Sequence, residues 1–165
     1  MPATALGRRM RRLLLEQPSQ RFSQVAEDPE LRSRRVCAWL LKEAQKLLSS
    51  DSAEAGRLAE LALFIADRLD PWSVPAVLVL DYQAHAWLLI GQSRTIAGEL
   101  PKASLALQMS GCLLTAGTGD FLLQVDFLES KARLYRARGE AELARRAELR
   151  ARRIANLRDG ARFCS

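Results

Sequence analysis

Apolar side chains recur every three or four positions along most of this chain, the spacing that places them on one face of an α-helix. Pro and Gly interrupt the pattern only at wide intervals, and β-branched residues are scarce. The pattern therefore predicts an all-α protein with about seven helices joined by short loops. Their approximate ranges are residues 3–16, 29–48, 53–69, 74–97, 101–115, 120–138 and 140–158.

Several helix ends are signalled by single residues. Asp28 followed by Pro29 predicts the start of the second helix, with Asp28 as the N-cap. Asp120 is the expected N-cap of the sixth helix. Gly160 is expected to end the seventh. The stretch PSQRFSQVAEDPE before Leu31 is interpreted as an irregular connector with at most one helical turn.

Two stretches look alike: RTIAGELPKASLA (94–106) and YRARGEAELARRA (135–147) lie 41 residues apart. Each has a turn glycine, Gly98 or Gly139, followed five residues later by a small residue, Ala103 or Ala144. Glycine adopts the positive φ of a helix C-terminus without steric strain, and alanine allows the returning helix to approach closely. The same helix–turn–helix elbow is therefore predicted twice.

The aligned elbows resemble the tetratricopeptide repeat. The first copy matches the family pattern at Trp87, Ile90, Gly91 and Ala103, whereas Arg94 stands where the family has Tyr. The second copy matches at residues 135, 139 and 144 and departs at residues 131 and 132, where Leu-Gly is usual. A degenerate first copy pairs residue 39 with small residues at 55, 59 and 62.

This resemblance covers residues 35–158 and implies stacked antiparallel helical hairpins, an α-solenoid. The 41-residue spacing exceeds the usual 34 residues of the family, so HEAT-like or other helical-hairpin arrays stay open as alternatives. We expect three segments: a basic amphipathic helix and connector (1–28), the repeat domain (29–160) and a tail (161–165).

In this family peptides bind along the first helix of each hairpin, which implies a concave groove. Carried over by position, its lining is His85, Leu88, Leu89, Gln92, Thr95, Asp126, Glu129, Ser130, Arg133 and Arg136, with Cys37, Leu40, Leu41 and Ala44 in the degenerate copy. The groove would hold a peptide or amphipathic helix with acidic residues near the two arginines. The alternative is that the leucines fill the space between repeats and that the arginines are solvated.

The charge distribution offers a second hypothesis. The net charge is +6, and the excess lies in residues 1–35 and 141–165. The candidate basic surface comprises Arg8, Arg9, Arg11, Arg12, Arg145, Arg146, Arg150 and Arg153. Such residues bind nucleic-acid phosphates in some proteins. Few aromatic residues lie nearby to stack bases, so solvated faces of capping helices are the preferred interpretation.

Catalytic and metal-binding patterns are not found in the sequence. The chain has one histidine, His85, which is interpreted as structural or groove-lining. Glu129 and Arg133 are spaced for an ordinary helical salt bridge. Cys112 lies in an apolar stretch and is expected in the core. We expect no cofactor, no metal and no enzymatic activity.

The sequence as a whole predicts a non-catalytic protein-interaction module. Three cysteines without a CxxC pair favour a reducing compartment, the cytoplasm, and no apolar stretch is long enough to suggest a membrane partner. Detached repeat domains of bacterial regulatory proteins offer an analogy. A nucleic-acid-associated helical protein is the rival function, and self-association through the groove is a further alternative.

Overall fold

The computed structural model of the protein describes residues 5–162, and these form helices and loops without any strand. The helices are α1 (Ala5–Leu15), α2 (Pro18–Glu27), α3 (Arg34–Leu47), α4 (Ser52–Ala66), α5 (Ala76–Ile96), α6 (Leu100–Ala116), α7 (Phe121–Ala137) and α8 (Ala141–Arg162). The prediction of an all-α fold is confirmed. The predicted number of helices is wrong by one within the described residues.

The additional helix is α2, which occupies the stretch interpreted as a connector. Pro18 stands in its first turn, where the missing N–H is no disadvantage. Val25 is fully buried, and Phe22 packs edge-on against Phe64 of α4 with ring centroids 5.4 Å apart. The inward face also carries a charged residue, Arg21, which is 6% exposed. That residue breaks the apolar periodicity and hides the helix in the sequence.

The start of α3 also differs from the prediction. Asp28 does not cap this helix, because its carboxylate accepts the backbone N–H of Glu30 at 2.9 Å in a local turn. The helix begins at Arg34, five residues after the predicted first residue, Pro29. Its N-cap is Ser33, whose Oγ accepts the N–H of Val36 at 3.5 Å. A weak Ser signal in an arginine-rich stretch was overlooked beside the Asp-Pro pair.

The other helix ends give a mixed result. Asp120 caps α7 as predicted, since its carboxylate accepts the N–H of Leu123 at 3.1 Å. Gly160 does not end α8, which continues to Arg162. Residues 161 and 162 of the predicted tail are therefore helical, and its residues 163–165 lie outside the described part of the chain.

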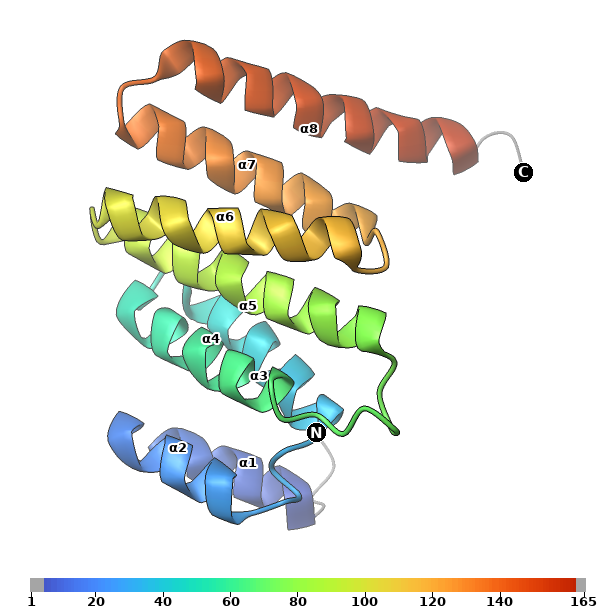
Figure 1. Cartoon of the computed structure of the whole chain (residues 1–165). Coiled ribbons are helices and arrows are strands. Elements are labelled where there is room, and N and C mark those ends of the chain that lie inside the picture. Colours follow the sequence, from blue (N-terminus) through green and yellow to red (C-terminus); the bar gives the residue numbers. More distant parts are fainter. Residues whose placement is uncertain (1–4, 163–165) are drawn as a thin grey trace.

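The helices are layered in chain order, with α1 and α2 at one end and α7 and α8 at the other (Figure 1). Each of the four consecutive pairs α1–α2, α3–α4, α5–α6 and α7–α8 packs together. In addition, α5 contacts α3 and α7, so the first helices of three successive pairs lie side by side. Since a single helix pair leaves an apolar face open, this stacking is what buries the core.

The core has two parts. The larger joins α1 to α6 and includes the fully buried Met10, Leu40, Leu58 and Ile65. The smaller lies between α5, α6 and α7, around Leu88 and residues 107, 123 and 134. The described chain is thus continuous in its packing from the first hairpin to α7.

The two predicted elbows share one backbone geometry. Gly98 and Gly139 both have φ of 77°. After Gly98, the N–H of Glu99 donates to the carbonyl of Arg94 at 2.9 Å, and after Gly139 the N–H of Glu140 donates to that of Tyr135 at 2.8 Å. These are the bonds of a Schellman C-cap, repeated with the same 41-residue offset. The prediction of a repeated helix–turn–helix elbow is confirmed.

The small residues before and after the elbow allow close packing. A Cβ added to Gly91 of α5 would lie 2.8 Å from Leu107 Cδ2 on α6. Ala103 and Ala144, on the returning helices, are 0% and 2% exposed. The small residues therefore recur at these positions because the paired helices approach too closely there for larger side chains.

Candidate functional site

The face formed by α3, α5 and α7 is where the predicted groove lies. Its residues divide into a buried set and an exposed set. Leu88 and Leu89 are 1% and 0% exposed and belong to the two core clusters. The buried set from the degenerate copy is Cys37, Leu40, Leu41 and Ala44. Leu40, Leu88 and Leu89 fill the space between hairpins and do not line an open groove, whereas Leu41 also reaches the edge of a cleft.

Two polar residues of the predicted groove are buried as well. Gln92 of α5 is 6% exposed, and its Nε2 donates to Ser130 Oγ of α7 at 2.6 Å. Ser130 Oγ in turn donates to the carbonyl of Asp126 at 2.7 Å. Thr95 bonds only within its own helix, to the carbonyl of Gly91 at 2.8 Å. Gln92 and Ser130 therefore join α5 to α7 rather than face a partner.

An open cleft of about 430 Å³ lies between α3 and α5, and we call it the α3–α5 cleft. Leu41, Tyr82 and the ring of His85 provide its apolar surface, and two lysines stand at its edge. The full lining is Ala38, Leu41, Lys42, Gln45, Lys46, Tyr82 and His85. Lys46 pairs with Glu43 at 2.8 Å, and no ion pair within 4 Å involves Lys42 among residues 5–162. The cleft is thus apolar with a cationic rim.

The titratable rings in this cleft are neutral near pH 7. Burial lowers the pKa of His85, and the nearby Asp120 carboxylate opposes that change. Burial raises the pKa of the Tyr82 phenol, while Arg34 acts in the opposite direction. The positive charge of the α3–α5 cleft therefore comes from its lysines and not from His85.

Three of the four charged residues predicted on α7 are exposed and paired, the exception being Asp126. Arg133 lies 3.6 Å from Glu129, so the predicted helical salt bridge is confirmed. Arg136 pairs with Glu148 of α8. Together with Ala132, Ala151 and Arg152, these four residues line a polar cleft of about 230 Å³ between α7 and α8. Burial and the neighbouring Glu129 raise the pKa of Asp126.

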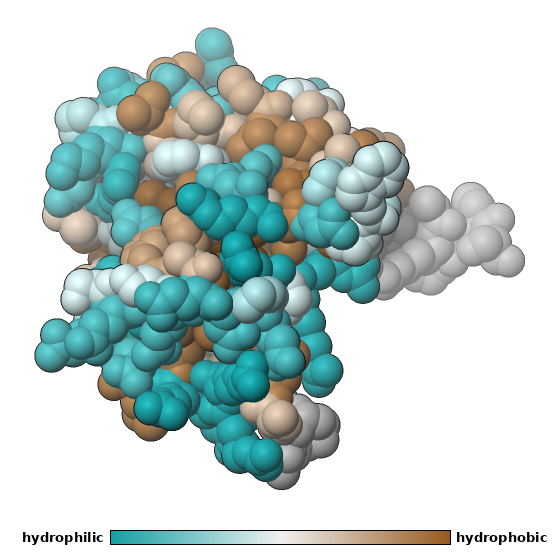
Figure 2. Space-filling model, turned by 60° about the horizontal axis from the view of Figure 1, so that its bottom comes forward, coloured by the Kyte–Doolittle hydropathy of each residue, from teal (hydrophilic) through white to brown (hydrophobic). Residues whose placement is uncertain are grey.

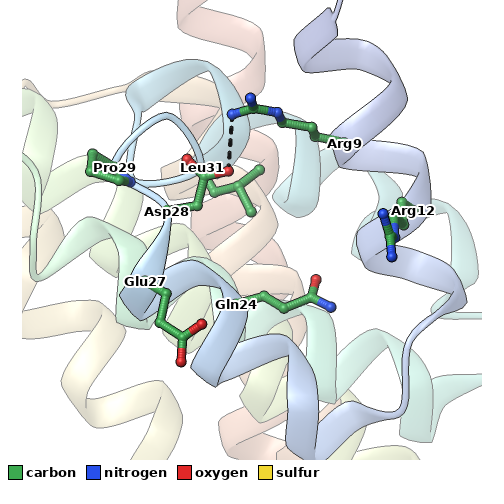
Figure 3. Close-up of a pocket in the computed structure, with 7 residues that line it drawn as sticks. All are labelled: Arg9, Arg12, Gln24, Glu27, Asp28, Pro29 and Leu31. Atoms are coloured by element: carbon green, nitrogen blue, oxygen red, sulfur yellow. Dashed lines mark hydrogen bonds and ion pairs between the residues drawn. The ribbon is translucent and has the colours of Figure 1, made fainter.

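At the N-terminal end, two of the four arginines of the predicted basic surface, Arg9 and Arg12, are paired with carboxylates. Arg9 lies 3.1 Å from Asp28 and 2.7 Å from Glu30. Arg12 pairs with Glu16 at 3.6 Å, and Arg11 Nε donates to the carbonyl of Gly7 at 3.4 Å. Arg8 is exposed. Figure 3 shows Arg9 reaching across to Asp28 at a cleft of about 500 Å³ between α1, α2 and the loop that follows.

At the other end, α8 carries arginines without such partners. Arg146 pairs with Glu142 at 3.1 Å. Arg145, Arg150 and Arg153 are exposed, and among the side chains of residues 5–157 none of the three has a carboxylate within 4 Å. Because α1 and α8 lie at opposite ends of the stack (Figure 1), the predicted basic residues form two separate surfaces. Figure 2, turned to bring the N-terminal end forward, shows hydrophilic side chains over much of that end.

The cysteines differ from each other in environment. Cys37 is fully buried, and burial raises the pKa of its thiol to about 12. Cys112 is exposed on α6, so the expectation that it lies in the core is wrong. It shares the outer face of this helix with Leu105 and Met109, which are 58% and 41% exposed. Cys112 lies in an apolar stretch of sequence, but that stretch does not fix which face of α6 carries it.

In the described residues no cluster of three or more His, Cys, Asp or Glu could hold a metal ion.

Comparison with known proteins does not assign a family. No protein-family model matches the chain, and no curated protein or solved structure is significantly similar to it. Over the described part of the chain, none of the helices has both the length and the apolar character needed to cross a membrane.

Five of the seven lining residues of the α3–α5 cleft lie outside the predicted set: Tyr82 of α5, the small Ala38, and three polar residues of α3, namely Lys42, Gln45 and Lys46. The last three recur at helical spacing on the exposed side of α3, directly beside the leucines that were singled out. The i, i+3, i+4 spacing of these three polar residues indicates a shared helix face in the sequence, but the family pattern assigns the groove to other positions of this helix.

Proposed function

We propose that the protein is a non-catalytic interaction module, an array of helical hairpins resembling tetratricopeptide repeats, which binds a peptide or short helix of another protein. The observation that carries this proposal is the α3–α5 cleft, an apolar surface with a cationic rim on the face where three first helices lie side by side. Grooves of this kind hold a partner through a few anchored side chains.

The chemistry of the cleft favours a ligand with an apolar side chain next to a carboxylate. The apolar side chain would lie against Leu41, Tyr82 and the neutral ring of His85. A carboxylate would then be near Lys42, which has no ion pair within the described chain. Apolar burial supplies most of the binding free energy, at about 25 cal/mol per Å² of apolar surface. The charge pair sets orientation and association rate.

A longer ligand would continue across α5 to α7 and meet Arg133 and Arg136. Both are paired within the chain, but these pairs are about half exposed, and such surface pairs contribute only about 0–1 kcal/mol. Exchange of Glu129 or Glu148 for a carboxylate of the ligand therefore costs little. The predicted preference for acidic residues near the two arginines is retained as part of the proposal.

Charge reversal of the lysine rim tests the proposal. Affinity purification with mass spectrometry would compare the wild-type chain, the double variant Lys42→Glu/Lys46→Glu and the matched control Arg145→Glu/Arg153→Glu. We expect a protein that is captured by wild type and control, is lost with the lysine variant, and binds the purified chain directly. Identical captured proteins for all three chains would remove the α3–α5 cleft from consideration.

A second candidate function is binding of nucleic acid, which the unpaired arginines on the outer surface of α8 favour. In this case Arg145→Glu/Arg153→Glu would abolish retention on duplex DNA or RNA, whereas Lys42→Glu/Lys46→Glu would leave it largely unchanged. Binding through phosphates would also weaken steeply with added salt.

We also propose a cytoplasmic location, on the basis of the cysteine pattern alone.

A further inference from the structure

A second groove lies between α6 and α8, with α7 beneath it, on the side of α7 opposite to the polar cleft of Arg133 and Arg136. We call it the α6–α8 groove. It has a volume of about 460 Å³. Phe127 and Leu128 of α7 form its floor, and Leu114 and Ile154 add apolar surface from the two walls. This groove shares no lining residue with the α3–α5 cleft. Of its lining residues the sequence predicted only Arg150, as part of the candidate basic surface.

The apolar surface extends beyond this groove. An adjoining cleft of about 690 Å³ shares Gln124 and Ile154 with it and is lined mainly by apolar side chains. Among these, Leu122 and Leu157 are 57% and 73% exposed. Large apolar side chains exposed side by side on two helices are unusual for a surface that meets only water. The pair of clefts therefore provides an elongated apolar track along α7 and α8.

The charged side chains that line the α6–α8 groove itself are both cationic, whereas Asp120 lines the adjoining cleft and Asp81 is bonded to Thr118. Its lining includes Lys131 and Arg150 but no acidic residue. Lys131 Nζ lies 5.6 Å from the ring centre of Phe127 and 5.7 Å from that of Tyr135, without a carboxylate partner in the described chain. Arg150 likewise has no ion pair there. By contrast, the cleft on the opposite side of the α7–α8 pair contains Glu129 and Glu148, which pair with two of its three arginines.

The wall of the groove next to α6 is held in place. Asp81 of α5 accepts the N–H of Thr118 at 3.0 Å and also binds the hydroxyl group of that residue. A Cβ added to Gly117 would collide with the Asp81 carboxylate, and one added to Gly111 would lie 2.8 Å from the ring of Phe127. These contacts fix the loop between α6 and α7 and the floor ring, so the groove is preformed.

We propose that the α6–α8 groove binds an acidic amphipathic helix of a partner protein. The apolar side of that helix would lie on Phe127, Leu114 and Ile154, and its carboxylates would face Lys131 and Arg150. The occupant is argued from charge: a groove with cations and no carboxylate is complementary to an acidic ligand. A second copy of this chain fits poorly, because the chain carries +6 and its terminal segments are the basic ones.

The test uses the full chain and a labelled synthetic helix of about 20 residues, with Leu at positions i, i+3, i+4 and i+7 and Glu elsewhere. A second peptide of the same pattern has Lys in place of Glu. Fluorescence anisotropy would compare wild type with Lys131→Glu/Arg150→Glu and with the matched control Arg145→Glu/Arg153→Glu, which changes the outer surface of α8. Arg145, Arg150 and Arg153 are exposed and Lys131 is partly exposed, so these exchanges should not prevent folding. Circular dichroism checks this for each variant.

We expect wild type and the control to prefer the Glu peptide, and the groove variant to bind it about tenfold or more weakly and to prefer the Lys peptide. A loss of peptide binding with Lys42→Glu/Lys46→Glu but not with the groove variant would place the peptide in the α3–α5 cleft and overturn the inference, which separates it from the proposed function. Equal binding of both peptides, equal effects of the groove and control variants, or a dimer in light scattering that only the groove variant dissociates would also overturn it.

Discussion

Arg21 on α2 donates through Nη1 to the carboxylate of Glu54 on α4, and this pair joins the N-terminal hairpin to the next one. The same guanidinium donates through Nε to the carbonyl of Glu16 at 3.1 Å and through Nη2 to that of Leu14 at 2.9 Å. It thereby satisfies a carbonyl of the last turn of α1 and that of Glu16 just after the helix, groups that have no partner within the helix. One buried side chain thus connects three helices.

Replacement of Arg21 by Ala should lower the free energy of unfolding by about 3 kcal/mol, because it leaves two carbonyls without their donor and removes the buried partner of the Glu54 carboxylate. Arg57 provides a matched control, since it also pairs with Glu54, at 2.7 Å, but is 44% exposed. Arg57→Ala should cost less than about 1 kcal/mol. Urea denaturation followed by circular dichroism measures both values, and equal losses would contradict this role of Arg21.

The case of Arg21 shows what a hydrophobic pattern misses. The positions of α3 to α8 follow from apolar residues at helical spacing, because a helix in this fold buries one apolar stripe. In α2 the stripe contains an arginine, whose partners lie on α1 and α4 and are invisible in the local sequence. The existence of α2 depends on tertiary contacts, and no window of a few residues contains that information.

Gly98 and Gly139 lead to a second prediction. Both have positive φ, and an added Cβ would meet nothing within 4 Å, so substitution affects only the backbone conformation. Gly98→Ala and Gly139→Ala should each cost roughly 1–2 kcal/mol, and Asn should cost less than Ala at both sites. The two losses should add in the double variant, since the turns are separate. A negligible loss with Ala at either site would contradict the C-cap geometry.

The single histidine predicts a dependence of stability on pH. Burial places the pKa of His85 in the folded chain below its usual value of about 6.5. Below that pH the unfolded chain binds more protons than the folded chain, so stability decreases as the pH falls. His85→Gln should reduce this loss between about pH 7.5 and 5.5. The raised pKa of Asp126 makes its own contribution to stability increase as the pH falls. This contribution is present in both wild type and His85→Gln, so it cancels in their difference.

Denaturation of wild type and His85→Gln at a series of pH values measures this effect. The difference in unfolding free energy between the two proteins should shift in favour of the variant as the solution becomes more acidic. A difference that stays constant across the range would show that His85 has the same pKa in the folded and unfolded chains.

Cys37 and Cys112 should react with thiol reagents at very different rates. Cys112 is exposed on α6 and should be alkylated by a maleimide in the native protein. Cys37 is buried with a raised pKa, and its Sγ lies 3.4 Å from the carbonyl of Ala62. It should react only when the structure opens, so denaturant should accelerate its labelling strongly. Peptide mapping by mass spectrometry reports both sites, and comparable native rates would place Cys37 at the surface.

The predicted binding site was harder to derive than the fold. Position in the repeat pattern identifies which helix carries a residue, but burial is decided by the angle at which neighbouring helices pack. Leu88 and Leu89 occupy groove positions by analogy, yet both are covered by neighbouring helices. Lys131 was considered only as a departure from the family pattern, although it lies at the α6–α8 groove. Side-chain exposure on a helix that contacts three others cannot be read from its own sequence.

The hydrogen bond from Gln92 to Ser130 gives the last prediction. Gln92 Oε1 is buried and has no partner in the described chain, so the amide is only partly satisfied. Gln92→Leu removes that unsatisfied oxygen, and Ser130 Oγ still donates to the carbonyl of Asp126. The variant should be within about 1 kcal/mol of wild type or more stable.

Ser130→Ala is the informative counterpart, because it leaves the whole buried amide of Gln92 without a partner. This change should cost about 1–3 kcal/mol. In the double variant Gln92→Leu/Ser130→Ala most of that loss should be recovered, since no buried polar group then lacks a partner. Thermal and urea denaturation of the three variants measures the cycle. If Gln92→Leu were the more damaging single change, the amide would have a partner that the fold of residues 5–162 does not contain, and binding at this face would be the first explanation to test.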